Sequence, residues 1–305
     1  MSTLARHSLV VDSDDKEGGG LSMHAMTQEV VRDLLMGNFA ASLLGGVLEA
    51  LGGLMAKFKM DQSSTFKVGR RYARHVKAAS SYARTGEVHA DGSCFPGLAT
   101  LCLTTGHFFH YVACAYSDAL AMHETELSAS VAMLGSDDVR AAIAYGNIGN
   151  VLIAQGKYPE ALERYEKCVA IEISTYGTDH ISVSDSYDNM GAIYGMMGKH
   201  SESLPLFEKG LAIRSKALGF NSLPVSSSFM NLGMFHSKLG KYSEALELFE
   251  KSLAIRITLL GSSHLSVASM YENIGGVHSQ QGRPEEAQKV WEKGLDILIE
   301  VRISR

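Results

Sequence analysis

The sequence contains little proline, few cysteines and none of the familiar catalytic motifs. Only five prolines occur in 305 residues, which suits long helices because proline interrupts them. The four cysteines, Cys94, Cys102, Cys114 and Cys168, have no C-x-x-C spacing and so do not indicate a zinc or redox site. No N-x-S/T acceptor occurs, and the polar amino terminus does not resemble a signal peptide. We therefore expect a cytoplasmic protein with reduced thiols.

Motifs for nucleotide binding and for nucleophilic or zinc-dependent catalysis are also absent. The sequence has no G-x-x-x-x-G-K-S/T, no G-x-S-x-G and no H-E-x-x-H, and no G-x-G-x-x-G follows a strand pattern. His107 and His110 are three residues apart, but a metal site there would need further ligands. We expect no enzyme activity, no catalytic residue, no metal and no cofactor.

Charge is unevenly distributed along a chain whose formal net charge is -5. Basic side chains outnumber acidic ones in residues 57–92, with Lys57, Lys59, Lys67, Arg70, Arg71, Arg74, Lys77 and Arg84 against Asp61, Glu87 and Asp91. A basic helix of this kind could bind nucleic acid, an anionic membrane or an acidic protein surface. A solvated helix face or a linker explains the same charges. No nucleic-acid-binding module accompanies them, which disfavours a nucleic acid partner.

One constant spacing runs through the rest of the chain. The residues that recur at this spacing are Asn147, Asn189, Asn231 and Asn273; Gly156, Gly198, Gly240 and Gly282; Gly135, Gly177, Gly219 and Gly261; and the aromatic Tyr165, Phe207, Phe249 and Trp291. Four ladders with one period and no insertion indicate a repeat architecture. We interpret the aromatic ladder as core residues.

Each repeat unit has the pattern of two helices joined by a short turn. In the third unit we predict helices over 225–239 and 243–260, with Gly240 in the turn, where a helix end favours a positive φ. The second helix carries an apolar stripe of Leu246, Phe249, Leu253 and Ile257. Such a stripe is buried only when another helix pair stacks on it. The predicted fold class is therefore all-α, a right-handed α-solenoid of stacked helix-turn-helix repeats.

The start of each unit carries helix-capping signals. Asp, Ser or His precedes the apolar start of the first helix, which suits an N-cap. His180 and His264 lie two periods apart, too far to share a metal, and we interpret them as capping or loop residues. Pro224 lies near the first helical position of the third unit, where its missing N–H costs nothing.

The ladder extends backward into a fifth, degenerate unit. Tyr116 lies one full period before Tyr158, and Cys114 takes the place of the turn glycine. We predict that the helix after Cys114 runs to Leu134. The resulting domain boundaries are a degenerate repeat at 93–134 and full repeats at 135–176, 177–218, 219–260 and 261–305. Before them we expect a disordered stretch at 1–24, an apolar helical segment at 25–58 and a basic linker or helix at 59–92.

The apolar segment at 25–58 permits two interpretations. Residues 34–56 are long enough for a transmembrane helix, but Asn38 and Glu49 lie inside this stretch and glycines dilute its hydrophobicity. Alternatively the segment is a degenerate repeat with Gly37 at the turn. We favour the interpretation without a membrane partner.

The repeat motif resembles a known family. The pattern N-I/M/L-G, then G-K-Y-x-E-A-L and Y/F-E-K, is similar to that of tetratricopeptide repeats, and the 42-residue unit that begins G-x-x-H-x-x-V and ends A-I-R-x-x-x-L-G resembles the kinesin light chain type. The resemblance implies a scaffold or cargo adaptor that binds a peptide in a concave groove. Similar repeats follow nucleotide-binding switch domains, so a regulatory or sensor module is the alternative, and a membrane-tethered adaptor a third. The heptads of the coiled coil that precedes the repeats in kinesin light chains are absent.

In resembling proteins the first helices line the groove, and the residue two before the packing glycine points into it. The groove candidates are Asn147, Asn189, Asn231, Asn273, Asp185, Asp188 and Lys238. A ladder of amides can pair with the backbone of an extended peptide, although each Asn could instead bond a neighbouring helix and only set the stacking. No residue one or four before each Asn is basic, and Asp185, Asp188 and Glu272 occupy three of these positions. This predicts a neutral or basic ligand and disfavours an acidic carboxy-terminal tail.

The given sequence ends at Arg305, one turn after the last repeat helix, so Trp291, Leu295 and Leu298 would have no following helix to cover them. Either this end is partly exposed, or it pairs with another copy of the protein, or the sequence is a fragment. We expect weak self-association through this edge.

Overall fold

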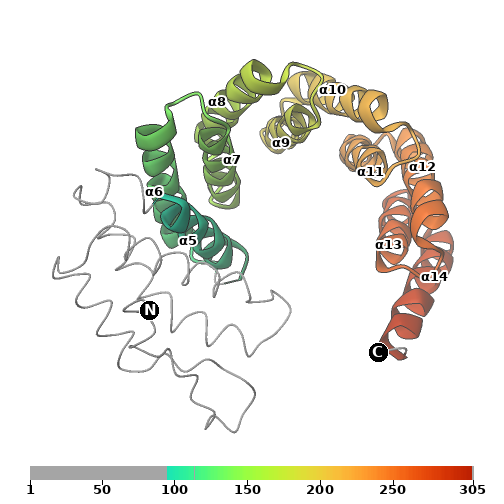
Figure 1. The fold of residues 1–305 in the computed structure, drawn as a ribbon. Coiled ribbons are helices and arrows are strands. Elements are labelled where there is room, and N and C mark those ends of the chain that lie inside the picture. Colours follow the sequence, from blue (N-terminus) through green and yellow to red (C-terminus); the bar gives the residue numbers. More distant parts are fainter. Residues whose placement is uncertain (1–94, 113, 304–305) are drawn as a thin grey trace, which may run out of the picture. The chain divides into compact units, whose positions relative to one another are not determined.

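The computed structural model describes residues 95–112 and 114–303, and every secondary-structure element among them is helical. The chain divides into two compact units between Arg164 and Tyr165. Figure 1 labels the helices. The segments predicted at 1–24, 25–58 and 59–92 lie outside the described residues. Of the helices that the structure describes, none is both long and apolar enough to cross a membrane.

The first unit contains the degenerate repeat and the start of the first full one. Its described elements are α5 (Phe95–His107), the π-helix η2 (Phe108–Val112), α6 (Tyr116–Leu134), α7 (Val139–Ala154) and the beginning of α8 (Tyr158–Tyr176). Helix α7 is capped by Asp138, whose carboxylate accepts the Arg140 N–H at 2.8 Å. Helix α6 ends at Leu134 as predicted.

Cys114 adopts the backbone conformation of the glycine that it replaces. Its φ is +49°, and no other non-glycine residue in the described part of the chain has a positive φ. The turn before α6 therefore keeps the geometry of the later turns, with a left-handed residue that carries a side chain.

The degenerate repeat also contains one extra residue, which the π-helix accommodates. A Cβ on Gly106 would collide with the His123 ring, so Gly106 is the packing glycine of this repeat. The next packing glycine is Gly149. The distance in sequence between these two glycines is one residue longer than the repeat period. A π-helix adds a residue to a helix without breaking it. His123 is fully buried at the position that Tyr165 occupies one repeat later.

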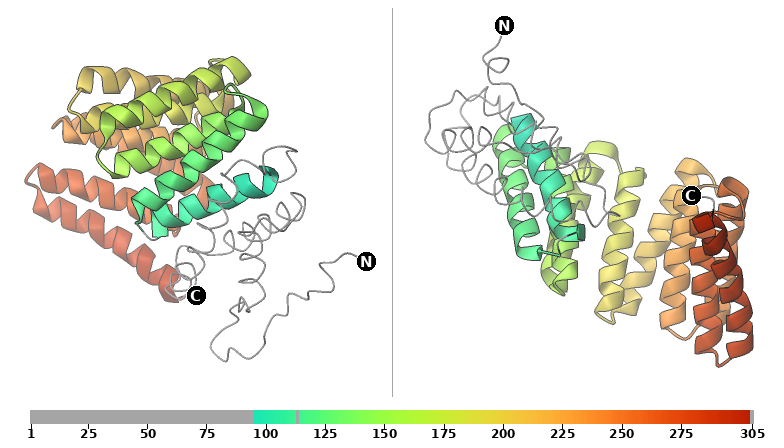
Figure 2. Two further views of the ribbon diagram at one scale, coloured as in Figure 1. Left: turned by 90° about the vertical axis from the view of Figure 1, so that its left-hand side faces the viewer. Right: turned by 90° about the horizontal axis from the view of Figure 1, so that it is seen from below.

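The second unit begins within α8 and continues as three helix pairs. They are α9 (Ile181–Met196) with α10 (His200–Leu218), α11 (Leu223–Lys238) with α12 (Tyr242–Leu260), and α13 (Leu265–Gln280) with α14 (Pro284–Ile303). Each pair packs as an antiparallel hairpin, and α10 also packs on α11 and α12 on α13 (Figure 2). The fold is thus the predicted all-α helical-repeat solenoid.

Turns and caps of the second unit follow the predicted chemistry. Gly198, Gly240 and Gly282 have φ of 72–73°, the left-handed conformation that ends the first helix of each pair. His180 and His264 are confirmed as caps, since their Nδ1 atoms accept the N–H groups of Ser182 and Ser266 at 3.3 and 3.1 Å.

The core lies between helix pairs. Phe249 is almost fully buried among Ala245, Met270, Ile274 and Val277. A Cβ on Gly233 would lie 2.7 Å from the Phe249 ring, so the glycine of the N-x-G motif lets the two helices approach each other.

The aromatic ladder is core in only three of its four members. Tyr165, Phe207 and Phe249 are buried, whereas Trp291 is 43% exposed. Trp291 packs its indole against Gly275, as Phe207 packs against Gly191 and Phe249 against Gly233. No helix follows α14 among the described residues.

Candidate peptide-binding surface

The four asparagines of the ladder have different surroundings. In the first unit, the Oδ1 of Asn147 accepts a hydrogen bond from His107 Nε2 at 3.3 Å, while its Nδ2 is buried without a partner among the described residues. In the second unit, Asn231 Nδ2 donates to Asp188 Oδ2 at 3.0 Å. These two asparagines bond a neighbouring helix.

Asn189 and Asn273 are half-buried and make no side-chain hydrogen bond with the rest of the described chain. For Asn273 the reason is visible in the sequence. Asn231 donates to Asp188, which lies 43 residues earlier in the sequence. The residue 43 positions before Asn273 is Met230, whose side chain has no comparable acceptor. The Asn273 amide therefore has no hydrogen-bond partner among the described side chains.

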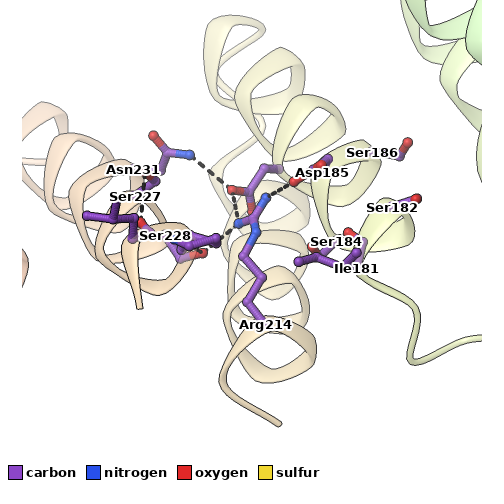
Figure 3. Close-up of polar contacts among 12 residues, drawn as sticks. Ile181, Ser182, Ser184, Asp185, Ser186, Arg214, Ser227, Ser228 and Asn231 are labelled. Atoms are coloured by element: carbon purple, nitrogen blue, oxygen red, sulfur yellow. Dashed lines mark hydrogen bonds and ion pairs between the residues drawn. The ribbon is translucent and has the colours of Figure 1, made fainter. Parts of the chain in front are cut away.

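Arg214 links three helices beneath this surface. Its guanidinium, which comes from α10, donates to Asp185 Oδ1 at 2.5 Å and Asp188 Oδ2 at 2.6 Å on α9, and to Ser228 Oγ at 2.5 Å on α11. Figure 3 shows the Arg214 side chain extending toward Asp185 and Ser228, with Asn231 completing the network. Burial raises the pKa of Asp188, and the charge and hydrogen bonds of Arg214 and the bond from Asn231 oppose this rise.

This network changes the expected electrostatics of the surface. Asp188 is 7% exposed and paired with Arg214, so it does not present its charge to a ligand as the sequence suggested. The side chain of Asp185 remains 68% exposed, with one oxygen paired. Glu272 is exposed and in no ion pair with a described residue.

Arg214 was not among the residues predicted from the sequence, although its spacing carries a signal. Glu172, Arg214 and Arg256 recur at the repeat period, late in the second helix of successive repeats. Each reaches a serine on the first helix of a pair: Glu172 accepts from Ser186 at 2.8 Å, and Arg256 donates to Ser226 at 2.8 Å. A charged residue that recurs beside an apolar stripe indicates a buried polar contact between neighbouring helices.

A pocket between α11 and α13 brings together two of the predicted residues. Its lining consists of Met234, Ser237, Lys238, Phe249, Glu272, Asn273, Gly276, Val277 and Gln280. Asn273 and Lys238 were candidates from the sequence, and Gly276 was not. The bond from Ser237 Oγ to Gln280 Oε1, 3.0 Å long, shows that residues about one repeat apart lie at the same height on these two helices.

Gly276 adds no side chain to the pocket lining. A Cβ at this position would meet no atom within 4 Å, and the equivalent residues one and two repeats earlier are Met234 and Ala192. Phe249 and Val277, both buried, also line the pocket. The lining thus combines buried apolar side chains, the Asn273 amide, and the charged Lys238 and Glu272.

Two further features lie outside this pocket. Leu295, Leu298 and Ile299 of α14 are exposed together with Trp291, whose Nε1 donates to the Glu272 carbonyl at 3.2 Å. In the described ranges, no group of three potential metal ligands is brought together. The His107 ring lies 5.5 Å from the His123 ring, centroid to centroid, and is tilted by 56° against it.

Comparison with known proteins agrees with this fold. Residues 140–216 and 225–300, about half of the chain, match the family model described as tetratricopeptide repeat. A search of curated proteins found no significant match.

Several solved structures have similar repeats. A putative kinesin light chain from Podosopora anserina with nearly identical TPR-like repeats has a TM-score of 0.56 at 22% identity, covering 68% of this chain and 96% of its own. BtubC (BKLC) from P. vanneervenii has 0.59 at 17%, covering 84% and 92%. The Rap conjugation gene regulator of plasmid pLS20, solved in complex with the Phr* peptide, has 0.57 at 13%, covering 86% and 76%. At these identities the similarity establishes the fold. The chain therefore belongs to the tetratricopeptide repeat family, with repeats that share the fold of kinesin-light-chain-like proteins.

Proposed function

We propose that this protein is an interaction scaffold, an adaptor that holds an extended segment of a partner polypeptide against its first helices. The observation that carries the proposal is the pocket between α11 and α13, in which the Asn273 amide has no partner among the described residues. A buried or half-buried amide gains most when a ligand backbone supplies its missing hydrogen bonds. The similarly folded Rap regulator, solved with a bound peptide, supports the same use of the fold.

The bound segment is neutral or basic rather than an acidic carboxy-terminal tail. Glu272 lies at the pocket and Asp185 is exposed on the neighbouring α9, whereas no basic residue occupies the positions beside the asparagines. The charge of Asp188 is balanced by Arg214, so Asp188 adds little to the negative charge of this surface. The expected preference for a neutral or basic segment is weaker as a result, but it is not reversed. Lys238, at the end of α11, adds a single positive charge.

A display experiment tests this proposal. The full chain is panned against a library of random peptides and against acidic carboxy-terminal tails, and enriched peptides are measured by fluorescence anisotropy. We expect Asn273→Ala to weaken binding without loss of stability, since this amide makes no hydrogen bond with another described side chain. Asn231→Ala is the contrasting variant. It breaks the bond to Asp188, so we expect it to lower stability. Selection of acidic tails alone, or of no peptide at all, would contradict the proposal.

The exposed edge of α14 supports weak self-association as a separate property. Trp291, Leu295 and Leu298 form an apolar surface on one helix, and apolar patches of this kind commonly mark contact sites. Sedimentation equilibrium should show a concentration-dependent mass that Trp291→Ala reduces. A constant monomer mass for both proteins would rule it out.

A further inference from the structure

The pocket between α11 and α13 has the shape and charge to select one pattern of side chains, an inference that rests on the proposed function and specifies its ligand. Its central feature is the vacancy at Gly276. A Cβ at this position would meet no atom within 4 Å, and the exposed Met234 and the buried Phe249 and Val277 line the same pocket. Methionine is flexible and polarizable, so Met234 can close around an inserted apolar group.

Opposite charges lie at the two ends of this vacancy. Glu272 of α13 lies level with Met230 of α11, because the two residues are one repeat apart. Lys238 is eight residues beyond Met230, which corresponds to about 12 Å along the helix at about 1.5 Å per residue. Neither charge forms an ion pair with a described residue. Gly276 lies between them, four residues beyond Glu272.

An extended peptide matches this offset along the helix axis. Alternate side chains of an extended chain project from the same face, and residues four apart are separated by about 13 Å. A positive residue, an apolar residue and a negative residue at alternate positions would therefore reach Glu272, the Gly276 vacancy and Lys238 together. Asn273, beside Glu272, can pair with the peptide backbone at the same time.

We propose that the pocket binds an extended segment of the form cation–x–apolar–x–anion, in either chain direction, with the apolar side chain over Gly276. The positive side chain faces Glu272 and the negative one faces Lys238. Such a segment carries no net charge, which agrees with the neutral ligand proposed above.

Four short fluorescein-labelled peptides test this pattern on the full-length protein. Two carry Arg-Ser-Leu-Ser-Glu or Glu-Ser-Leu-Ser-Arg at the centre of a Gly-Ser sequence. The two controls carry Arg-Ser-Leu-Ser-Arg or Glu-Ser-Leu-Ser-Glu. Anisotropy titrations should show at least one mixed-charge peptide binding more tightly than both controls. Gly276→Met should weaken that binding about tenfold or more, since it fills the site of the apolar side chain.

A charge-reversal variant should gain binding to a different peptide, a result that a folding defect cannot produce. Glu272→Lys places positive charge at both ends, so its preference should change to the Glu-Ser-Leu-Ser-Glu peptide. Circular dichroism verifies that Gly276→Met and Glu272→Lys keep their helicity. Equal binding of all four peptides, or binding insensitive to Gly276→Met, would overturn the pattern while the display-selected peptides still support the scaffold. Failure of the display selection as well would overturn both.

Discussion

Replacement of Arg214 by methionine should destabilise the second unit strongly and in a pH-dependent manner. Methionine keeps much of the length of the arginine side chain but removes its charge and donors. Asp188, 7% exposed, would then retain only the Asn231 amide among its present side-chain partners. Ser228 would also lose the donor at 2.5 Å.

The expected loss follows from the burial of Asp188. Removing one partner of a buried ion pair costs about 3–5 kcal/mol, because the other charge stays buried without compensation. An exposed pair in the same unit provides the comparison. Lys216 and Asp179 have side chains that are 71% and 61% exposed, and pairs of this kind contribute about 0–1 kcal/mol. Lys216→Met is thus the matched control.

The pH dependence has a defined sign. Burial already raises the pKa of Asp188, and removal of Arg214 removes the main opposing effect. The folded variant then binds a proton at Asp188 that the unfolded chain releases, so stability falls as the pH rises above the ordinary aspartate range. The free-energy loss should be larger at about pH 8 than at about pH 5, because protonation at the lower pH neutralises the buried carboxylate.

Urea denaturation followed by circular dichroism measures both effects. The double variant Arg214→Met with Asp188→Asn should recover most of the lost stability, since it leaves no buried unpaired charge. The reasoning would be refuted if Arg214→Met cost no more than Lys216→Met. A loss that is independent of pH would equally contradict the assignment to Asp188.

Three further predictions concern packing and turns, all read out as urea midpoints. Cys114→Gly should stabilise the protein by about 1 kcal/mol, because it relieves a left-handed conformation; a destabilised variant would contradict this. Gly240→Ala, at a φ of 72°, should cost about 1 kcal/mol, whereas Gly276→Ala, on an open helical site, should stabilise by up to about 1 kcal/mol; effects of the same sign would contradict one of the two geometries. Phe249→Ala should cost about 3–5 kcal/mol and Trp291→Ala distinctly less, because Phe249 is buried whereas Trp291 is 43% exposed. Equal losses of stability would mean that the Trp291 side chain is buried as well.

Periodicity predicted the repeated features of the fold and failed where neighbouring repeats differ. The predicted helix at 243–260 is observed as Tyr242–Leu260, and the one at 225–239 as Leu223–Lys238. Even Cys114 has the positive φ of the glycine that it replaces. These features depend on local backbone geometry and on helical spacing, which a single sequence records directly.

The candidate surface was less accessible to sequence reasoning, because its character depends on contacts between helices. The asparagine ladder looks uniform, yet Asn231 is bonded to Asp188 while Asn273 has no partner among the described side chains. Asp188 seemed a ligand-facing acid, but Arg214 reaches it from a helix in the same pair. The vacancy at Gly276 follows from the loss of a side chain that Met234 supplies one repeat earlier, and only the packed structure shows that the space is unfilled.

The most direct test of the scaffold account is site-specific photocrosslinking. A benzophenone amino acid is introduced at Met234, in the pocket, or at Glu250, an exposed position of α12, and each protein is irradiated with a biotinylated peptide from the display selection. We predict a crosslinked product at position 234 that excess unlabelled peptide abolishes, and none at position 250. Crosslinking at position 250 alone, or equally at both, would contradict binding of the partner on the α11 and α13 surface.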